Sequence, residues 1–299
     1  METEVPTAKE ARGKETAPPT GWRVAGAILL TIGVVAGAVA VYLLERRGSS
    51  AEAIWLWLFA LAALPVGLNF GVSDPLHLAR PKANRELAAV LGILALATVI
   101  QIALPPESRI ADQSSPVELS SILRGEVRNL FAPGPSGLSP LSYWVALPLA
   151  TMVGGAALAV RWGAAIEGLA SILLLYLVAR RVVPFIAAAV GALLLALTPW
   201  HIQTSQGGLF EMQLLVGPLL LFYLLLRAID SRRPIEYLLT GYAGGLCLTL
   251  TQAPLVGPMA ALLYLLFRAI REPAFMRRQG VMLLLSGAGV ILFASPFLA

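Results

Sequence analysis

Long apolar runs alternate with short polar segments along almost the whole chain. Each long run could cross roughly 30 Å of hydrocarbon as a helix of about 20 residues. The nine predicted spans lie near residues 24–44, 54–71, 87–104, 163–179, 183–199, 209–226, 235–251, 255–267 and 281–298. The pattern therefore predicts an all-α polytopic membrane protein with about nine transmembrane helices.

The composition excludes an ordinary water-soluble enzyme. Of 299 residues, 58% are hydrophobic and 13% are charged, against about 45–50% and 25% in soluble domains. The one cysteine, Cys247, allows no disulfide framework, and two histidines, His77 and His201, argue against a histidine-rich metal centre. The net charge of +5 is not taken as a nucleic-acid signal, because in a membrane protein the placement of basic residues sets topology.

The apolar run at 139–160 decides the topology of everything after it. If this run does not cross the membrane, most of the 22 Lys and Arg residues fall in cytoplasmic loops, and if it crosses, most fall outside. Pro140, Pro148 and Gly154-Gly155 also interrupt its helical continuity. We therefore expect a juxtamembrane or re-entrant helix at 139–160, with the amino terminus in the cytoplasm.

This topology predicts three parts. Residues 1–21 read as a disordered cytoplasmic tail, 22–86 as an additional transmembrane hairpin with a cytoplasmic loop, and 87–299 as a membrane core. The core carries a long outer-face loop at 105–162, in which 117–131 has the apolar spacing of an amphipathic interfacial helix. Long ordered loops often carry function, although a merely solvated surface helix would show the same pattern.

The order of segments over about 87–299 resembles the GT-C fold glycosyltransferases that use polyprenyl-phosphate sugars. These include the family 39-like protein O-mannosyltransferases and the aminoarabinose transferases. Ser139-Pro140-Leu141-Ser142-Tyr143-Trp144 resembles the family's HPPLYYW, and GLASILLLYLVARR at 168–181 resembles a second family stretch. ALTPWHIQTSQGGLFEMQLL at 196–215 resembles the stretch that ends in SREARxY or SRxxRxD.

The resemblance implies a membrane glycosyltransferase. It would move a hexose or pentose, with inversion, from a polyprenyl-phosphate donor to a protein, lipid or glycan acceptor. The active site would face the extracytoplasmic side of the cytoplasmic membrane, in the cell envelope, with membrane lipid and no nucleic acid as partners.

The resemblance also implies catalytic carboxylates. Asp112 occupies the position of the family's loop aspartate, the general base, although Asp is also favoured as a helix cap. Glu211 occupies the second acidic position, where it would orient the acceptor or share a divalent cation, Mg²⁺ or Mn²⁺, with Asp112. The alternative is a Glu favoured by the dipole at a helix start.

Further residues are candidates for substrate binding. Arg109, Arg124 and Arg128 are outer-face cations suited to a donor phosphate, or to anionic lipid headgroups. Tyr143, His201 and Gln252 lie in stretches that match the family, and a lone interfacial His can also be structural. Glu167 is an intramembrane carboxylate that we expect to pair with Arg161.

The chain departs from the family in its positive charges. Where the family has SREAR, this chain reads Ser205-Gln206-Gly207-Gly208-Leu209, and Thr251-Gln252 replaces Thr-Lys. An inactive relative that binds lipid-linked sugar or scaffolds a partner is therefore a second hypothesis. A transporter is a third, although no inverted repeat is visible.

Overall fold

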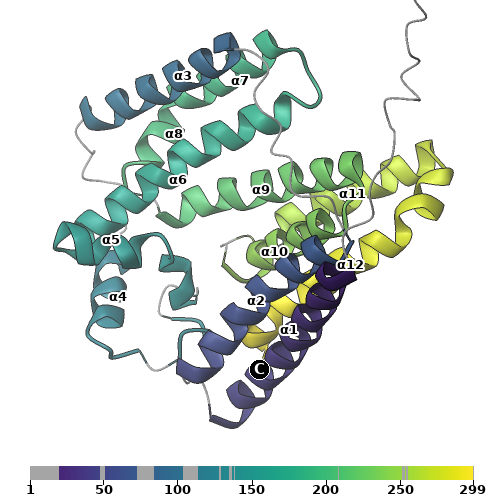
Figure 1. The fold of residues 1–299 in the computed structure, drawn as a ribbon. Helices are drawn as coiled ribbons and strands as arrows, with labels where there is room; N and C mark the ends of the chain where they lie inside the picture. The colour runs from purple at the N-terminus through teal and green to yellow at the C-terminus, as the bar shows by residue number, and fades with distance from the viewer. Residues whose placement is uncertain are drawn as a thin grey trace, which may run out of the picture.

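The computed structural model describes residues 20–47, 51–72, 84–103, 114–127, 129–134, 137, 139–207, 209–250, 253 and 255–298. Within these ranges every regular element is a helix (Figure 1). The elements are α1 (Thr20–Arg47), α2 (Ala51–Val72), α3 (Asn84–Ala103), α4 (Ser114–Leu123), η1 (Pro140–Tyr143), α5 (Ala146–Val153), α6 (Ala156–Ala179), α7 (Phe185–Leu197), α8 (Pro199–Thr204), α9 (Leu209–Ser231), α10 (Pro234–Leu250), α11 (Val256–Arg271) and α12 (Ala274–Leu298). The predicted all-α class is confirmed.

Six of these helices, rather than nine, are long and apolar enough to cross a membrane. They cover Trp22–Arg46, Ala51–Phe70, Arg85–Ala103, Ala156–Ala179, Leu209–Ser231 and Ala274–Phe297. The other three predicted spans form shorter helices, because α7, α10 and α11 have 13, 17 and 16 residues. At 1.5 Å per residue such helices reach about 20–26 Å, which is short of the hydrocarbon thickness.

The run at 139–160 is broken, as its prolines and glycines predict. A short 3₁₀ turn, η1, leads into α5, which ends at Gly154 with a left-handed φ of 76°. Helix α6 then starts at Ala156, earlier than the predicted residue 163. The amphipathic helix expected over 117–131 is shorter than predicted, because α4 ends at Leu123 before Gly125, whose φ is 72°.

Two ion pairs show how α3, α6 and α9 run: α3 is antiparallel to α6, whereas α6 and α9 are parallel. Glu86 at the start of α3 lies 3.0 Å from Arg180, just after α6, and Arg181 lies 2.7 Å from Asp230 near the end of α9. The opposite ends of α3, α6 and α9 therefore lie together. We call that side, which carries α4 and α5, the α4–α5 end, and the other side, which carries the turn between α11 and α12, the α11–α12 end (Figure 1).

Glycines allow α10 and α12 to approach each other closely. A Cβ added at Gly241 would lie 2.2 Å from the carbonyl oxygen of Ser286, and one at Gly289 would lie 2.8 Å from that of Leu238. Small residues commonly permit such contact between membrane helices.

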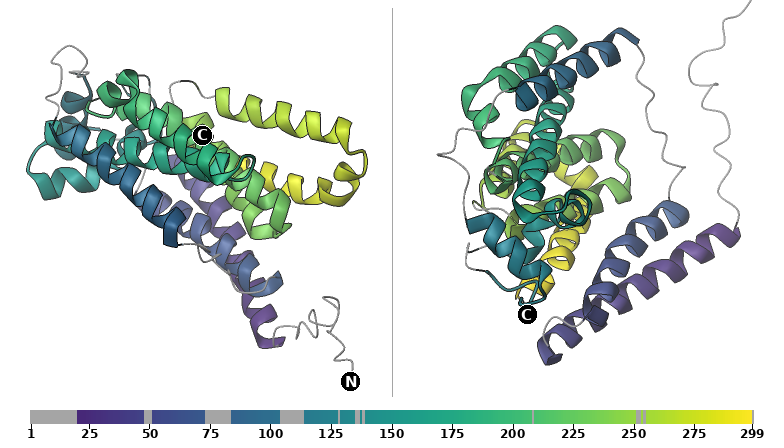
Figure 2. Two further views of the ribbon diagram at one scale, coloured as in Figure 1. Left: turned by 90° about the horizontal axis from the view of Figure 1, so that it is seen from above. Right: turned by 90° about the vertical axis from the view of Figure 1, so that its left-hand side faces the viewer.

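The hairpin of α1 and α2 packs against α12. Figure 2 shows the two helices side by side along one flank of the molecule. The indole Nε1 of Trp57 donates to the carbonyl of Leu292 at 3.3 Å. The Trp57 ring lies edge-on to Phe131, Phe293 and Phe297, at centroid distances of 5.4, 5.4 and 6.3 Å. This aromatic cluster joins the hairpin, the segment after α4 and the end of α12.

Candidate functional site

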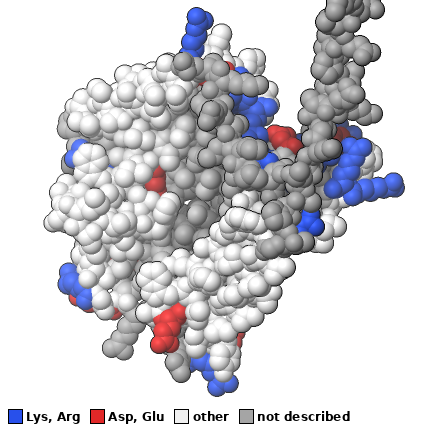
Figure 3. Space-filling view, in the orientation of Figure 1, with Lys and Arg blue, Asp and Glu red and all other residues white. Residues whose placement is uncertain are grey.

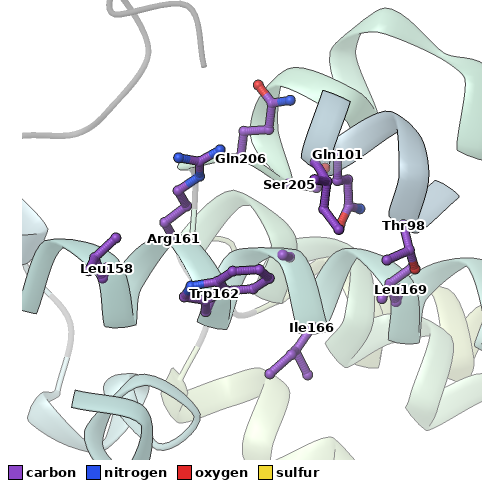
Figure 4. Close-up of a pocket in the computed structure, with 11 residues that line it drawn as sticks. Thr98, Gln101, Leu158, Arg161, Trp162, Ile166, Leu169, Ser205 and Gln206 are labelled. Atoms are coloured by element: carbon purple, nitrogen blue, oxygen red, sulfur yellow. The ribbon is translucent and has the colours of Figure 1, made fainter. Parts of the chain in front are cut away.

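A groove of about 220 Å³ lies at the α4–α5 end, between α3, α6 and the turn after α8. Its walls are mainly apolar, with one arginine, two glutamines, a serine and a threonine among them. The lining residues are Thr98, Gln101, Ile102, Leu158, Arg161, Trp162, Ala165, Ile166, Leu169, Ser205 and Gln206. Figure 4 shows Arg161 and Gln206 on the same side of the groove, with Gln101 and Ser205 further along it.

Arg161 supplies the positive charge of this groove. Its half-buried side chain forms no ion pair with any residue that the structure describes. Gln101 and Gln206 are each 8% exposed and add amide groups beside it. A guanidinium beside amides and an apolar wall suits a ligand that combines a phosphate with a hydrocarbon chain.

Gly168 explains how three segments meet at the groove. A Cβ at this position of α6 would lie 2.7 Å from the Cβ of Ser205 and 3.3 Å from Nε2 of Gln101. Only a residue without a side chain lets α3 and the turn after α8 approach α6 so closely.

A chain of buried polar groups runs behind the groove. The hydroxyl of Tyr143 donates to Oε2 of Glu118 at 3.2 Å. The neighbouring Ser142 carbonyl accepts from Nε2 of Gln213, which also donates to Oε1 of Glu167 at 3.1 Å. These contacts connect α4, η1, α6 and α9 inside the α4–α5 end.

Among the described residues, no hydrogen-bond donor reaches three oxygens of this buried polar network. They are Oε1 of Glu118, Oε2 of Glu167 and Oε1 of Gln213, on side chains that are 6%, 2% and 4% exposed. Buried acceptors without donors are costly. The arrangement can therefore receive donors such as sugar hydroxyls or water, or a cation.

The expected pair of Glu167 with Arg161 was wrong. Residues six positions apart on an α-helix project about 120° apart around its axis, so Glu167 turns inward to Gln213 while Arg161 lines the groove. The contributions of Gln213 and Glu118 were not identified from the sequence. Gln213 is a polar residue within the apolar run of α9, and such an exception is the sequence signal that could have identified it.

His201 is almost fully buried, at 1% exposure, in the short helix α8. Its Nε2 lies 2.9 Å from Oγ of Ser171, whose own proton goes to the carbonyl of Gly168 at 2.7 Å. This contact joins α8 to α6 in either tautomer of the ring. Burial lowers the pKa of His201 and favours the neutral ring, against an opposing backbone hydrogen bond.

The other predicted site residues that the structure describes have different surroundings. Tyr143 is fully buried against Phe210, with its hydroxyl on Glu118. Glu211 is half-buried in the first turn of α9, and no hydrogen bond or ion pair is recorded for it within the described ranges. Arg124 is exposed and pairs with Glu126 at 2.6 Å, which lowers the pKa of that carboxyl.

The remaining candidates, Arg109, Asp112, Arg128 and Gln252, lie outside the described residues. Of the expected cation site of Asp112 and Glu211, the structure therefore describes Glu211 alone. Among the described residues, no three His, Cys, Asp or Glu side chains group as metal ligands.

A comparison with protein families identifies the chain. The family model of dolichyl-phosphate-mannose-protein mannosyltransferases matches residues 135–299. This stretch includes Tyr143, Arg161, His201 and Glu211, whereas α1 to α4 precede it. No curated protein and no solved structure gives a significant match. The resemblance found in the sequence is thus confirmed, and the chain belongs to the dolichyl-phosphate-mannose-protein mannosyltransferase family.

Proposed function

We propose that this membrane glycosyltransferase moves a sugar, with inversion, from a polyprenyl-phosphate donor to an acceptor at the extracytoplasmic face of the cytoplasmic membrane. The family and the apolar helices establish the coarse class, a GT-C type membrane glycosyltransferase. The proposal adds the orientation, the donor site and the residues that act.

The groove at Arg161 is the observation that carries this proposal. Gln206 stands where the family's SREAR pattern has an arginine, and Arg161 lines the same groove from α6. The guanidinium of Arg161 would thus replace the lost charge and bind the donor phosphate. Ile102, Leu158 and Ile166 would contact the first isoprene units.

The acceptor side of the reaction is assigned to two carboxylates. Asp112 would take the proton of the acceptor hydroxyl as that oxygen attacks the anomeric carbon, while the polyprenyl phosphate leaves with the bonding electron pair. Glu211 would orient the acceptor, or hold Mg²⁺ or Mn²⁺ with Asp112 against the leaving phosphate. Arg109, Arg124 and Arg128, with Tyr143, His201 and Gln252, are proposed as further substrate contacts.

Turnover of the purified chain with a panel of polyprenyl-phosphate sugars tests the proposal. Wild type should transfer sugar and gain thermal stability with its donor. Asp112→Asn should lose turnover and keep the donor-dependent stabilisation. Glu107→Gln changes a carboxylate in the same outer loop and serves as the matched control.

Two outcomes would contradict this function. Stabilisation by donors without turnover in the wild type would favour an inactive relative, the second candidate, which the glutamine at position 206 supports. If no donor changed the thermal stability or was turned over, the proposed donor site would be wrong and the transporter hypothesis would have to be tested.

A further inference from the structure

A second polar hollow lies at the α11–α12 end, remote from the Arg161 groove. It has a volume of about 220 Å³ and is bounded by the ends of α9 and α11 and the start of α12. Three arginines, Arg232, Arg268 and Arg278, line it. Figure 3 shows Lys and Arg gathered on the right-hand side of the molecule, where Figure 1 places the turn between α11 and α12. We call this hollow the arginine recess.

The acidic residues of the arginine recess do not neutralise it. Asp230 is held by Arg181 at 2.7 Å, and Glu272 lies 3.6 Å from Arg268. Within the described ranges, the guanidinium groups of Arg232 and Arg278 have no recorded hydrogen bond or ion pair. Two positive charges without an acidic partner among the described residues therefore face the same small volume.

The backbone at Arg232 supports a role for its side chain. Arg232 directly follows α9 with a φ of 57°, in the left-handed region. Glycine is the usual residue at such a helix end, because any side chain there costs conformational energy. An arginine at this strained position indicates that the guanidinium contributes something that glycine cannot.

The floor of the recess is rigid. Gln279 is 5% exposed, accepts from the hydroxyl of Tyr237 and donates to the carbonyl of Ile229 at 3.3 Å. Arg268 is held by the hydroxyl of Tyr264 at 3.2 Å and lies over the ring of Phe275 at 5.5 Å. The floor and Arg268 are thus held in place, whereas the side chains of Arg232 and Arg278 at the rim are exposed.

An apolar groove of about 730 Å³ adjoins the recess. It runs between α9, α10, α11 and α12, and it is lined on the recess side by Leu265, Ala269 and Met276. Arg268 and Phe275, the sequence neighbours of Ala269 and Met276, line the recess. The two cavities share no lining residue but have neighbouring residues of α11 and α12 in their walls. A cationic recess beside an apolar groove matches the two halves of an anionic lipid.

We propose that the arginine recess binds the phosphate of an anionic membrane lipid whose acyl chain lies in the adjoining groove. This site is independent of the proposed donor site, because it uses other helices at the opposite end of the molecule.

The test measures binding of phosphatidylglycerol to the full chain in detergent, by native mass spectrometry and by thermal stabilisation. The double variant Arg232→Gly, Arg278→Gln removes both unpaired charges. We expect its affinity for phosphatidylglycerol to fall about 25-fold, at roughly fivefold for each arginine. Without lipid, Arg232→Gly should unfold no earlier than the wild type, because glycine relieves the strained φ.

Three comparisons make the result decisive. Arg277→Gln removes a charge from the same turn of α12 that does not line the recess, and it should leave lipid binding unchanged. Equal binding of phosphatidylcholine, which carries no net charge, would overturn the proposal, as would an unchanged affinity in the double variant. Equal stabilisation by inorganic phosphate would also overturn it, since the ligand would then be soluble. Sugar transfer plays no part in these readouts, so they are separate from the test of the proposed function.

Discussion

The side-chain amide of Gln213 donates to Oε1 of Glu167 at 3.1 Å and so attaches a buried carboxylate of α6 to α9. The same amide donates to the carbonyl of Ser142, and no donor among the described residues reaches the second carboxylate oxygen of Glu167. One glutamine thus compensates part of the cost of placing Glu167 inside an apolar protein.

Replacing Gln213 by leucine should lower the free energy of unfolding by about 1–3 kcal/mol, because it leaves the Glu167 carboxylate without its donor. The double variant Glu167→Leu, Gln213→Leu should lose less than the two single variants together. Thermal unfolding in detergent measures all four proteins. Additive losses across this cycle would show that the two side chains are uncoupled.

Arg161→Gln should raise the KM for the polyprenyl-phosphate sugar by about tenfold or more, because a charged hydrogen bond to the donor phosphate is lost. Its thermal stability without donor should change little, since Arg161 has no ion-pair partner among the described residues. Steady-state kinetics with varied donor provides the measurement. Arg46→Gln, which removes an exposed charge from α1, is the control, and an unchanged KM in Arg161→Gln would place the phosphate elsewhere.

Gly241→Ala should destabilise the protein by about 1–3 kcal/mol, because the added methyl would force α10 and α12 apart. Gly280→Ala is the matched control in α12, since nothing lies within 4 Å of its added Cβ. That substitution should be neutral or stabilise by up to about 1 kcal/mol through helix propensity. The two unfolding midpoints, compared under the same conditions, decide the matter, and equal midpoints would disprove close packing at Gly241.

Stability should fall on acidification through His201. Burial lowers the pKa of His201 below its ordinary value of 6.5, so the unfolded chain takes up the proton first as the pH falls. The contribution of His201 to the free energy of unfolding is constant above the pKa that this residue has in the unfolded chain, and it is lost as the pH falls below that value. Unfolding takes up at most one proton at this residue.

Unfolding midpoints measured from about pH 7.5 to 5.5 should therefore decline more steeply in the wild type than in His201→Gln. Both proteins keep His77, so their difference isolates His201. Parallel profiles would show that His201 titrates alike in the folded and unfolded chains.

The helices were largely predictable, because lipid-facing and buried positions alike demand apolar residues over the length of a span. The break at 139–160 was predictable as well, from Pro140, Pro148 and Gly154. The span count was not, since α10 and α11 are apolar along their length but shorter than the hydrocarbon thickness. Hydropathy reports the polarity of a run and not where its helix begins and ends.

The candidate site was harder to predict, because its parts come from separate helices. Arg161 and Gln206 are 45 positions apart and meet only because Gly168 lets the turn after α8 lie against α6. Glu118 and Tyr143 likewise meet through tertiary packing. Residue types and spacing identified Tyr143 and Glu167 as candidate functional residues. The partner of each depends on which faces of the helices pack together, and the sequence does not specify this packing.

The aromatic cluster around Trp57 links the stretch that matches the family model to the part of the chain that precedes it. Trp57 and Phe131 precede the stretch that matches the family, whereas Phe293 and Phe297 lie within it. A chain shortened to the matched stretch would lack Trp57 and Phe131, and Phe293 and Phe297 near the end of α12 would lose these two contacts. The hairpin of α1 and α2 thus supports the family core, and a shift of Trp57 would act directly on Phe131 in the segment between α4 and η1.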